Sequence, residues 1–326
     1  MPDAWEVTTG GRDVVVAVID SGVDIDHPDL ADRIYVNMGE IPGDRIDNDR
    51  NGYVDDVSGW DFFGDDANPQ PNISRDAVDG THHGTAVAGI IGAAGNNAQG
   101  IAGVNWNVRI LPIRVLNSEG EGTFQNIVDA IDYAVAMGAD VINMSFVGEF
   151  SSRPLDMALQ RAYDANVVVV AAAGNTDEGQ DLDRSPLYPV CSTGTGRDDV
   201  VIGVVATMHN DERAPFSNYG SDCVDIAAPG ILMMTTQVET DDTQAYGDNW
   251  HGTSFAAPLV SGSAALIRSA YPEATVEEVR AILQLTVDPV RGTAPSGEAG
   301  ALGTGRMNVG RAFERLPEYL GREPVR

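Results

Sequence analysis

Short, largely apolar runs recur along the first two thirds of the chain, and segments with helical periodicity lie between them. Valine and isoleucine dominate these runs, as expected for strands that are buried on both faces of a parallel sheet. The runs cover residues 14–19, 109–115, 141–144, 167–172 and 200–205. Strands that alternate with helices in this way predict an α/β fold, with a doubly wound, mostly parallel sheet and helices on both faces.

Two of the helical segments carry recognisable end signals. Residues 125–138 place apolar side chains on one stripe and end on Gly138, a residue type that commonly terminates helices. Residues 275–283 open with Thr275 and Glu278, the two partners of an N-terminal capping box. We expect a helix at each place.

The length and composition favour one large globular unit. The chain has 326 residues, 43% of them hydrophobic, which is enough to bury a sizeable core. Because no repeat, low-complexity segment or linker divides it, we expect a single domain over residues 1–326. No stretch approaches the roughly 20 apolar residues of a membrane-spanning helix, and the first residues lack the basic and apolar segments of a signal peptide. We therefore expect no membrane partner.

Charge and cysteine content narrow the choice of partners. The formal net charge is −29, and all 20 basic residues are arginines. Nucleic acids and anionic lipids are excluded as expected partners, because phosphate binding needs a positive surface. The two cysteines, Cys191 and Cys223, are compatible with one disulfide in an oxidising compartment or with two buried thiols.

Polar residues with catalytic potential stand where the predicted elements begin or end. Asp20 ends the first apolar run, His83 precedes a helix of small residues, and Ser254 opens an apolar helix. A serine hydroxyl needs a base to take its proton, and that base needs a carboxylate to orient it. Asn175, which follows the fourth run, offers an amide donor for an oxyanion, and a helix N-terminus beside Ser254 favours the same charge. Singly, such residues are typical of caps and turns. Together they predict nucleophilic acyl transfer.

Seven segments carry a resemblance to a known family. In chain order they are VVVAVIDSGVDIDHPDL, HGTAVAGII, DVINMSF, VVVAAAGN, FSNYGS, VDIAAPG and GTSFAAP. From about residue 4 to residue 315 the chain resembles the subtilisin-like serine peptidases. This resemblance implies a serine endopeptidase with Asp20, His83 and Ser254 as its triad and Asn175 as its oxyanion donor. It also implies secretion, protein or peptide substrates, a monomer, and a pro-segment, not included in this sequence, that assists folding and inhibits the enzyme.

The resemblance also implies a substrate groove. Its predicted residues are Gly120, Glu121, Gly122, Ser145, Phe146, Val147, Gly148, Ala173 and Gly174, with further pocket wall near residues 188–189. Since these walls are small or apolar, we expect an apolar residue before the cleaved bond. Val147 adds bulk that favours leucine, methionine or alanine over tryptophan. The acidic segment 176–183 raises the alternative of a basic residue, through Asp177, Glu178 or Asp181.

Three positions depart from the family pattern. His82 stands where a glycine usually precedes the catalytic histidine, and Ala86 replaces a usual histidine. The sequence His-Gly-Thr assigns the catalytic role to His83 and leaves His82 as a neighbour. His251 stands two residues before Thr253, and we expect it at the rim of the site.

A second cluster, DNDRNGYVDD, lies at residues 47–56. Oxygen ligands at alternate positions, with Gly52 for a sharp turn, follow the order of a Ca²⁺ loop. The predicted metal ligands are Asp47, Asp49, Asn51, the Tyr53 carbonyl, Asp55 and Asp56. Position twelve is Ser58, so the last acidic ligand of an EF-hand is missing, and an acidic surface turn is the alternative. The family resemblance implies a weaker second Ca²⁺ site, formed by Asp29, Asn97 and the carbonyl groups of Gly95, Gln99 and Ile101.

Two other functions fit the same residues. A catalytically silent module of this fold would bind calcium without hydrolysing peptides. An esterase or transacylase would use the same triad on another substrate class.

Overall fold

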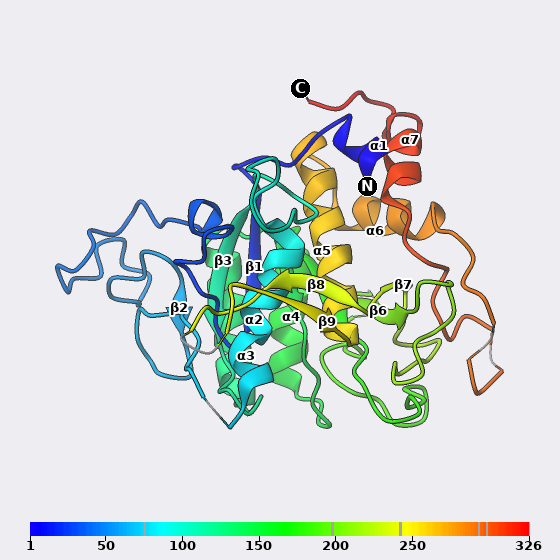
Figure 1. The fold of residues 1–326 in the computed structure, drawn as a ribbon, viewed down its shortest axis with the longest axis horizontal. Helices are drawn as coiled ribbons and strands as arrows, with labels where there is room; N and C mark the ends of the chain where they lie inside the picture. Colours follow the sequence, from blue (N-terminus) through cyan, green and yellow to red (C-terminus); the bar gives the residue numbers. More distant parts are fainter. Residues whose placement is uncertain (75, 197–198, 241–242, 293, 298, 326) are drawn as a thin grey trace.

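A computed structural model describes residues 1–74, 76–196, 199–240, 243–292, 294–297 and 299–325, and its centre is a seven-stranded parallel sheet (Figure 1). The strand order is β2-β3-β1-β4-β5-β6-β7. The bounds are β1 (Val15–Asp20), β2 (Trp60–Asp61), β3 (Arg109–Arg114), β4 (Val141–Met144), β5 (Val168–Ala172), β6 (Ile202–Thr207) and β7 (Ile226–Pro229). All five predicted strands are present within two residues of their expected ends. β2 and β7 were not predicted.

Helices cover both faces of the sheet, which confirms the predicted fold. α2 (Val78–Gly92) and α5 (Thr253–Ala270) pack on one face, while α3 (Phe124–Ala136) and α4 (Arg153–Asp164) pack on the other (Figure 1). Side chains of the central strand β1 alternate between two hydrophobic cores. Val16 and Val18 lie in the core under α2 and α5, and Ala17 lies in the core under α3 and α4. Each face of the sheet therefore has its own core.

The helices α6 (Val276–Leu285), α7 (Val309–Leu320) and α1 (Pro2–Trp5) form a connected group that packs beside α5. α6 begins with the predicted capping box: Glu278 N donates to Thr275 Oγ1 and Thr275 N donates to Glu278 Oε2. α7 packs against α6 and against α1, so the two chain ends lie near each other in Figure 1. A short 3₁₀ helix covers Ala31–Arg33.

An antiparallel hairpin of β8 (Met233–Thr236) and β9 (Tyr246–Trp250) lies on α2. Thr235 Oγ1 and Thr236 Oγ1 each donate to a carbonyl oxygen of α2, at 2.7 Å. Gly89 of α2 permits this contact, because a Cβ there would lie 2.1 Å from Thr236 Oγ1. The hairpin is thereby fixed beside the helix that carries His83.

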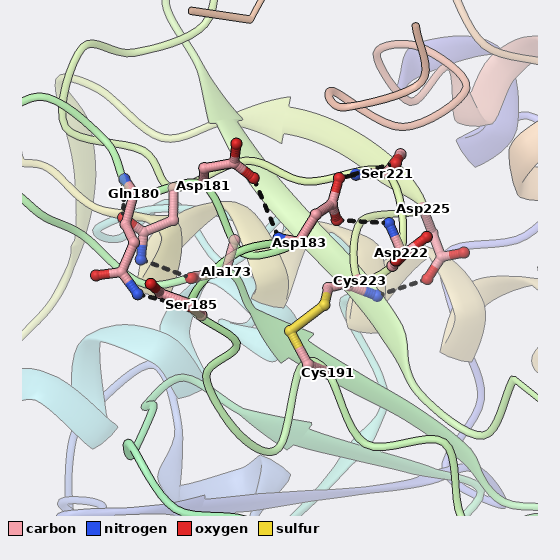
Figure 2. Close-up of a disulfide and its surroundings, with 12 residues drawn as sticks. Ala173, Gln180, Asp181, Asp183, Ser185, Cys191, Ser221, Asp222, Cys223 and Asp225 are labelled. Atoms are coloured by element: carbon pink, nitrogen blue, oxygen red, sulfur yellow. Dashed lines mark hydrogen bonds between the residues drawn. A yellow bond between two sulfur atoms is a disulfide. The ribbon is translucent and has the colours of Figure 1, made fainter. Parts of the chain in front are cut away.

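The two cysteines form a disulfide. Cys191 and Cys223, 32 residues apart, are joined beside the loop in which Asp183 accepts hydrogen bonds from Ser221 and Asp222 (Figure 2). The bridge connects the segment that follows residue 188 to the start of β7. Among the described residues, no helix combines the length and apolarity needed to span a bilayer.

Candidate active site

Asp20 and His83 form a hydrogen-bonded pair at the carboxyl end of β1. Asp20 is the last residue of β1 and is fully buried, and its Oδ1 accepts from His83 Nδ1 at 2.8 Å and from Ser21 N at 2.7 Å. His83 is the sixth residue of α2, so it lies inside this helix rather than ahead of it. Gly84 allows the helix to approach so closely, because a Cβ there would lie 2.2 Å from the carbonyl oxygen of Gly22.

The pair has a defined electrostatic character. Burial lowers the pKa of His83, but the charge of Asp20 and its hydrogen bond raise it, and the net pKa is raised. About a quarter of the His83 side chain remains exposed, with 23% accessible to solvent. The carboxylate therefore stabilises an imidazolium that faces the solvent-accessible cleft.

Ser254 is the second residue of α5 and makes reciprocal contacts with Ser145. Its Oγ donates to the Ser145 carbonyl at 2.9 Å, and Ser145 Oγ donates to the Ser254 carbonyl at 2.9 Å. The second contact explains Pro258. Pro258 lies in the second turn of α5, where its missing N–H leaves the Ser254 carbonyl without its helical donor. Ser145 supplies the lost donor.

Asn175 follows β5 and faces the same cleft as Ser254 and His83. Its Oδ1 accepts from Thr253 N at 2.9 Å and from Thr253 Oγ1 at 3.2 Å. Because Thr253 occupies the oxygen, the amide NH₂ points away from Thr253 and can donate into the cleft. Gly174 N donates to Thr253 Oγ1 at 3.0 Å and completes the arrangement. Sequence reasoning did not single out Thr253 as the residue that orients this amide.

One cleft of about 500 Å³ unites these groups. Three catalytic candidates line it, together with residues of α2, β9 and the hairpin loop: Asp79, His82, His83, Asn175, Gln237, Thr243, Asp248, Asn249, Trp250, His251, Ser254 and Phe255. Asp20 supports His83 from beneath. The cleft thus brings together a hydroxyl, an imidazole with its carboxylate and an amide donor, which is the set that acyl transfer requires.

Most of the predicted substrate-binding residues surround a second, smaller cavity of about 110 Å³. Gly120, Gly122, Phe146, Val147 and Gly148 line it, whereas Glu121 does not. Gly148 pairs with Tyr188 through two backbone hydrogen bonds of 2.7 and 2.9 Å. Ala173 is buried, and its carbonyl oxygen accepts from Asn218 Nδ2. Ser145 thus contacts Ser254 directly, and Gly174 contacts its neighbour Thr253.

Comparison with known proteins gives the family of the chain. A model of the subtilase family matches residues 11–305. The chain belongs to the subtilase family. This subtilase is 35% identical to thermitase of Thermoactinomyces vulgaris over 292 residues, which cover 90% of this chain and 87% of thermitase. It is 34% identical to subtilisin DY of Bacillus licheniformis over 300 residues, which cover 92% of this chain and 90% of that protein.

A solved structure gives the same result. A protease from Pseudoalteromonas arctica is 31% identical and superposes with a TM-score of 0.72, covering 95% of this chain and 92% of the other. This subtilase is therefore a serine endopeptidase of the family, with the family's fold and protein substrates.

The loop at residues 47–56 brings only part of the predicted metal set together. Asp47 and Asp49 lie with Glu40 in an acidic cluster whose oxygens are within 4.8 Å of one another, a group that can hold a metal ion. Asp55 instead accepts from the backbone of residues 43 and 45, and the Tyr53 carbonyl stays a predicted ligand. Glu40 was missed because it lies outside the quoted pattern.

Asp56 and Asn51 connect this loop to the protein core. Asp56 is buried and accepts from Tyr133 Oη at 2.7 Å and from the amides of Asn37 and Asn51 at 2.9 Å each. Burial raises the pKa of Asp56, against the effect of these three donors. Both residues thus organise the loop from inside, beneath the acidic cluster.

The residues of the second implied calcium site are engaged with one another. Asp29 is buried and accepts from Asn97 Nδ2 at 2.7 Å and from Ile101 N at 3.2 Å. Burial, and then a hydrogen bond with Asp29, raise the pKa of Tyr246 to about 12. The Asp29 carboxylate is therefore bound by N–H groups of the protein. Asn97 directs its amide nitrogen, not its amide oxygen, toward that carboxylate.

The remaining candidates lie at the margins of the site. His82 is buried, its Nδ1 accepts from Val238 N at 3.2 Å, and burial lowers its pKa. His251 is exposed at the rim, and its Nδ1 accepts from Leu232 N. Asp181 forms an ion pair with Arg184. The described residues that line the catalytic cleft include no member of segment 176–183.

Proposed function

We propose that residues 1–326 form one catalytic domain that hydrolyses peptide bonds through Ser254, His83, Asp20 and Asn175. The observation that carries this assignment is the 2.8 Å hydrogen bond between His83 Nδ1 and buried Asp20, beside a cleft that Ser254 also lines. The bond fixes the tautomer that leaves Nε2 of His83 available as a base.

In the proposed reaction Ser254 turns its hydroxyl from the Ser145 carbonyl to His83 and attacks the peptide carbonyl carbon. His83 takes the hydroxyl proton and passes it to the leaving nitrogen, and Asp20 stabilises the imidazolium between these events. The oxyanion receives hydrogen bonds from Asn175 Nδ2 and from the backbone N–H of Ser254 in the first turn of α5. Water then gives a proton to His83 and attacks the acyl carbon, the ester bond to Ser254 breaks, and His83 returns the proton to Ser254 Oγ.

We propose that the acidic cluster holds Ca²⁺. Glu40, Asp47 and Asp49 supply hard carboxylate oxygens, the ligands that Ca²⁺ prefers, and three such groups repel one another without a cation. Bound Ca²⁺ would stabilise the native loop by mass action, since the unfolded chain has no such site.

We further propose that the enzyme is secreted as a monomer and acts after removal of a pro-segment that assists folding. The Cys191–Cys223 disulfide supports an oxidising compartment, because such bridges rarely persist in the cytosol. The apolar walls at residues 145–148 support an apolar residue before the cleaved bond.

Active-site labelling tests the residue assignment. A fluorophosphonate probe reacts covalently only with an activated serine, so the wild-type protein is expected to be labelled at Ser254 and Ser254→Ala is expected to remain unlabelled. Parallel assays on a peptide amide and on the matching ester separate an endopeptidase from an esterase. An intact, folded protein that resists the probe would favour the catalytically silent module.

A further inference from the structure

The chemistry fixes which side of Ser254 receives the residue before the cleaved bond. The leaving nitrogen must take its proton from His83, so the segment that leaves lies over the His83 side of the cleft. In the proposed pose the acyl segment runs along residues 145–148, which begin at Ser145, the residue that exchanges two hydrogen bonds with Ser254. With its carbonyl oxygen toward Asn175, an acyl residue in this pose has its side chain beside residues 145–148 and beside Gly174, which directly precedes Asn175.

Two side chains cross that space. A Cβ placed on Gly174 would lie 2.9 Å from Val147 Cγ2 and 3.4 Å from Leu187 Cδ1. Real Cβ contacts essentially never fall below 3.0 Å, so the Val147 methyl already touches the opposite wall of the slot. Val147 and Leu187 are both only partly buried, so part of each side chain is accessible.

The backbone around these two residues holds them in place. The paired residues Gly148 and Tyr188 directly follow Val147 and Leu187, and their two hydrogen bonds join the two segments. Cys191 N donates to the Leu187 carbonyl at 2.9 Å, and the disulfide anchors Cys191 to Cys223 (Figure 2). Valine is also stiff at χ1, because its Cβ is branched. The slot thus has little freedom to widen.

We propose that Val147 and Leu187 together restrict the residue before the cleaved bond to alanine, glycine or serine. This inference rests on the roles proposed above for Ser254, His83 and Asn175. It replaces the expected preference for leucine or methionine with a preference for small side chains, since leucine, methionine and phenylalanine would each need to displace the Val147 methyl group. Val147 acts as the nearer wall and Leu187 as the floor behind it.

A series of peptide p-nitroanilides that differ only in the residue before the cleaved bond tests the proposal. With the wild-type enzyme, kcat/KM for alanine is expected to exceed that for phenylalanine by at least about tenfold, since one misfit methylene alone is worth about 10–200-fold. Val147→Gly is expected to raise kcat/KM for phenylalanine by about tenfold or more and so to lower the alanine-to-phenylalanine ratio. The double variant Val147→Gly/Leu187→Gly is expected to raise kcat/KM for phenylalanine further.

Controls separate this proposal from the catalytic assignment. Leu285→Ala, an exposed position on α6, is expected to leave the alanine-to-phenylalanine ratio unchanged. Val147→Ala provides a milder variant if glycine impairs folding, and phosphonate labelling counts the active sites in every preparation. A labelled wild-type enzyme that cleaves after phenylalanine as well as after alanine would overturn the proposal, as would an unchanged ratio in a labelled Val147→Gly. Failure of the wild type to label would instead overturn the roles of Ser254 and His83.

Discussion

Ser145 and Ser254 exchange hydroxyl-to-carbonyl hydrogen bonds of 2.9 Å in both directions. Ser145 starts the segment that we propose as one wall of the substrate slot, and Ser254 lies in the first turn of α5. The position of the proposed nucleophile and the position of the slot wall are thus set by the same pair of contacts.

The triad assignment predicts distinct effects at the two adjacent histidines. Ser254→Ala or His83→Ala is expected to remove nearly all turnover, because triad members act as a unit. His82→Ala is expected to retain most of it, since His82 accepts from Val238 N on the hairpin and makes no hydrogen bond to the triad that the structure describes. Initial rates on one peptide substrate, normalised to protein that melts normally, check both. An inactive His82→Ala beside an active His83→Ala would shift the assignment by one residue.

The Asp20–His83 pair predicts the pH dependence. His83 must be neutral to act as a base, and its raised pKa places the acidic limb of kcat/KM above pH 6.5, with activity increasing as pH rises through it. Asp20→Asn removes the charge that raises the pKa, so the burial effect prevails and the limb moves to lower pH. The same variant is expected to reduce kcat by about 10⁴. A limb that stays in place in Asp20→Asn would contradict the electrostatic role of Asp20.

The oxyanion assignment predicts a loss in kcat rather than in binding. Asn175→Ala removes one preorganised donor and is expected to lower kcat by about 10²–10³, with little change in KM. Steady-state kinetics on a peptide substrate, with melting temperature as the folding control, measure this. A loss of less than about tenfold in a normally melting variant would show that another group holds the oxyanion.

The acidic cluster predicts metal-dependent stability. Removing Ca²⁺ with excess chelator, or substituting Asp49→Ala or Glu40→Gln, is expected to lower the melting temperature and to hasten autolysis, because an ion bound only by the native state adds to stability. Asp177→Asn, an exposed carboxylate outside the cluster, is the matched control. Melting curves with and without Ca²⁺ measure the effect. Curves unaffected by chelator would show that Ca²⁺ does not stabilise this protein.

The sheet could be predicted where burial on both faces leaves a continuous apolar run, as at residues 168–172. β2 and β7 gave no such signal, because β2 has two residues and β7 has four and ends in proline. The hairpin was also missed. Its second strand reads Tyr-Gly-Asp-Asn-Trp and has no buried residue, so its position depends on threonine contacts with α2 rather than on apolar alternation.

The proposed active-site residues were accessible to sequence reasoning because each stands at or near the end of an element in a recognisable motif. Glu40 and Leu187 were not. Glu40 reaches the acidic loop through hydrogen bonds from the backbone of Asn48 and Asp49, and Leu187 reaches Val147 through the pairing of Tyr188 with Gly148. Such neighbours are created by tertiary folding, and no local spacing in the sequence records them.

The contacts of Thr253 with Asn175 Oδ1 have a consequence for the energetics of the reaction. Water around a forming oxyanion must reorient, and that reorientation adds to the barrier. Here the amide is aligned by folding, before any substrate is bound. In the proposed reaction its dipole needs no reorganisation when negative charge develops, so part of the work of catalysis is completed each time the chain folds.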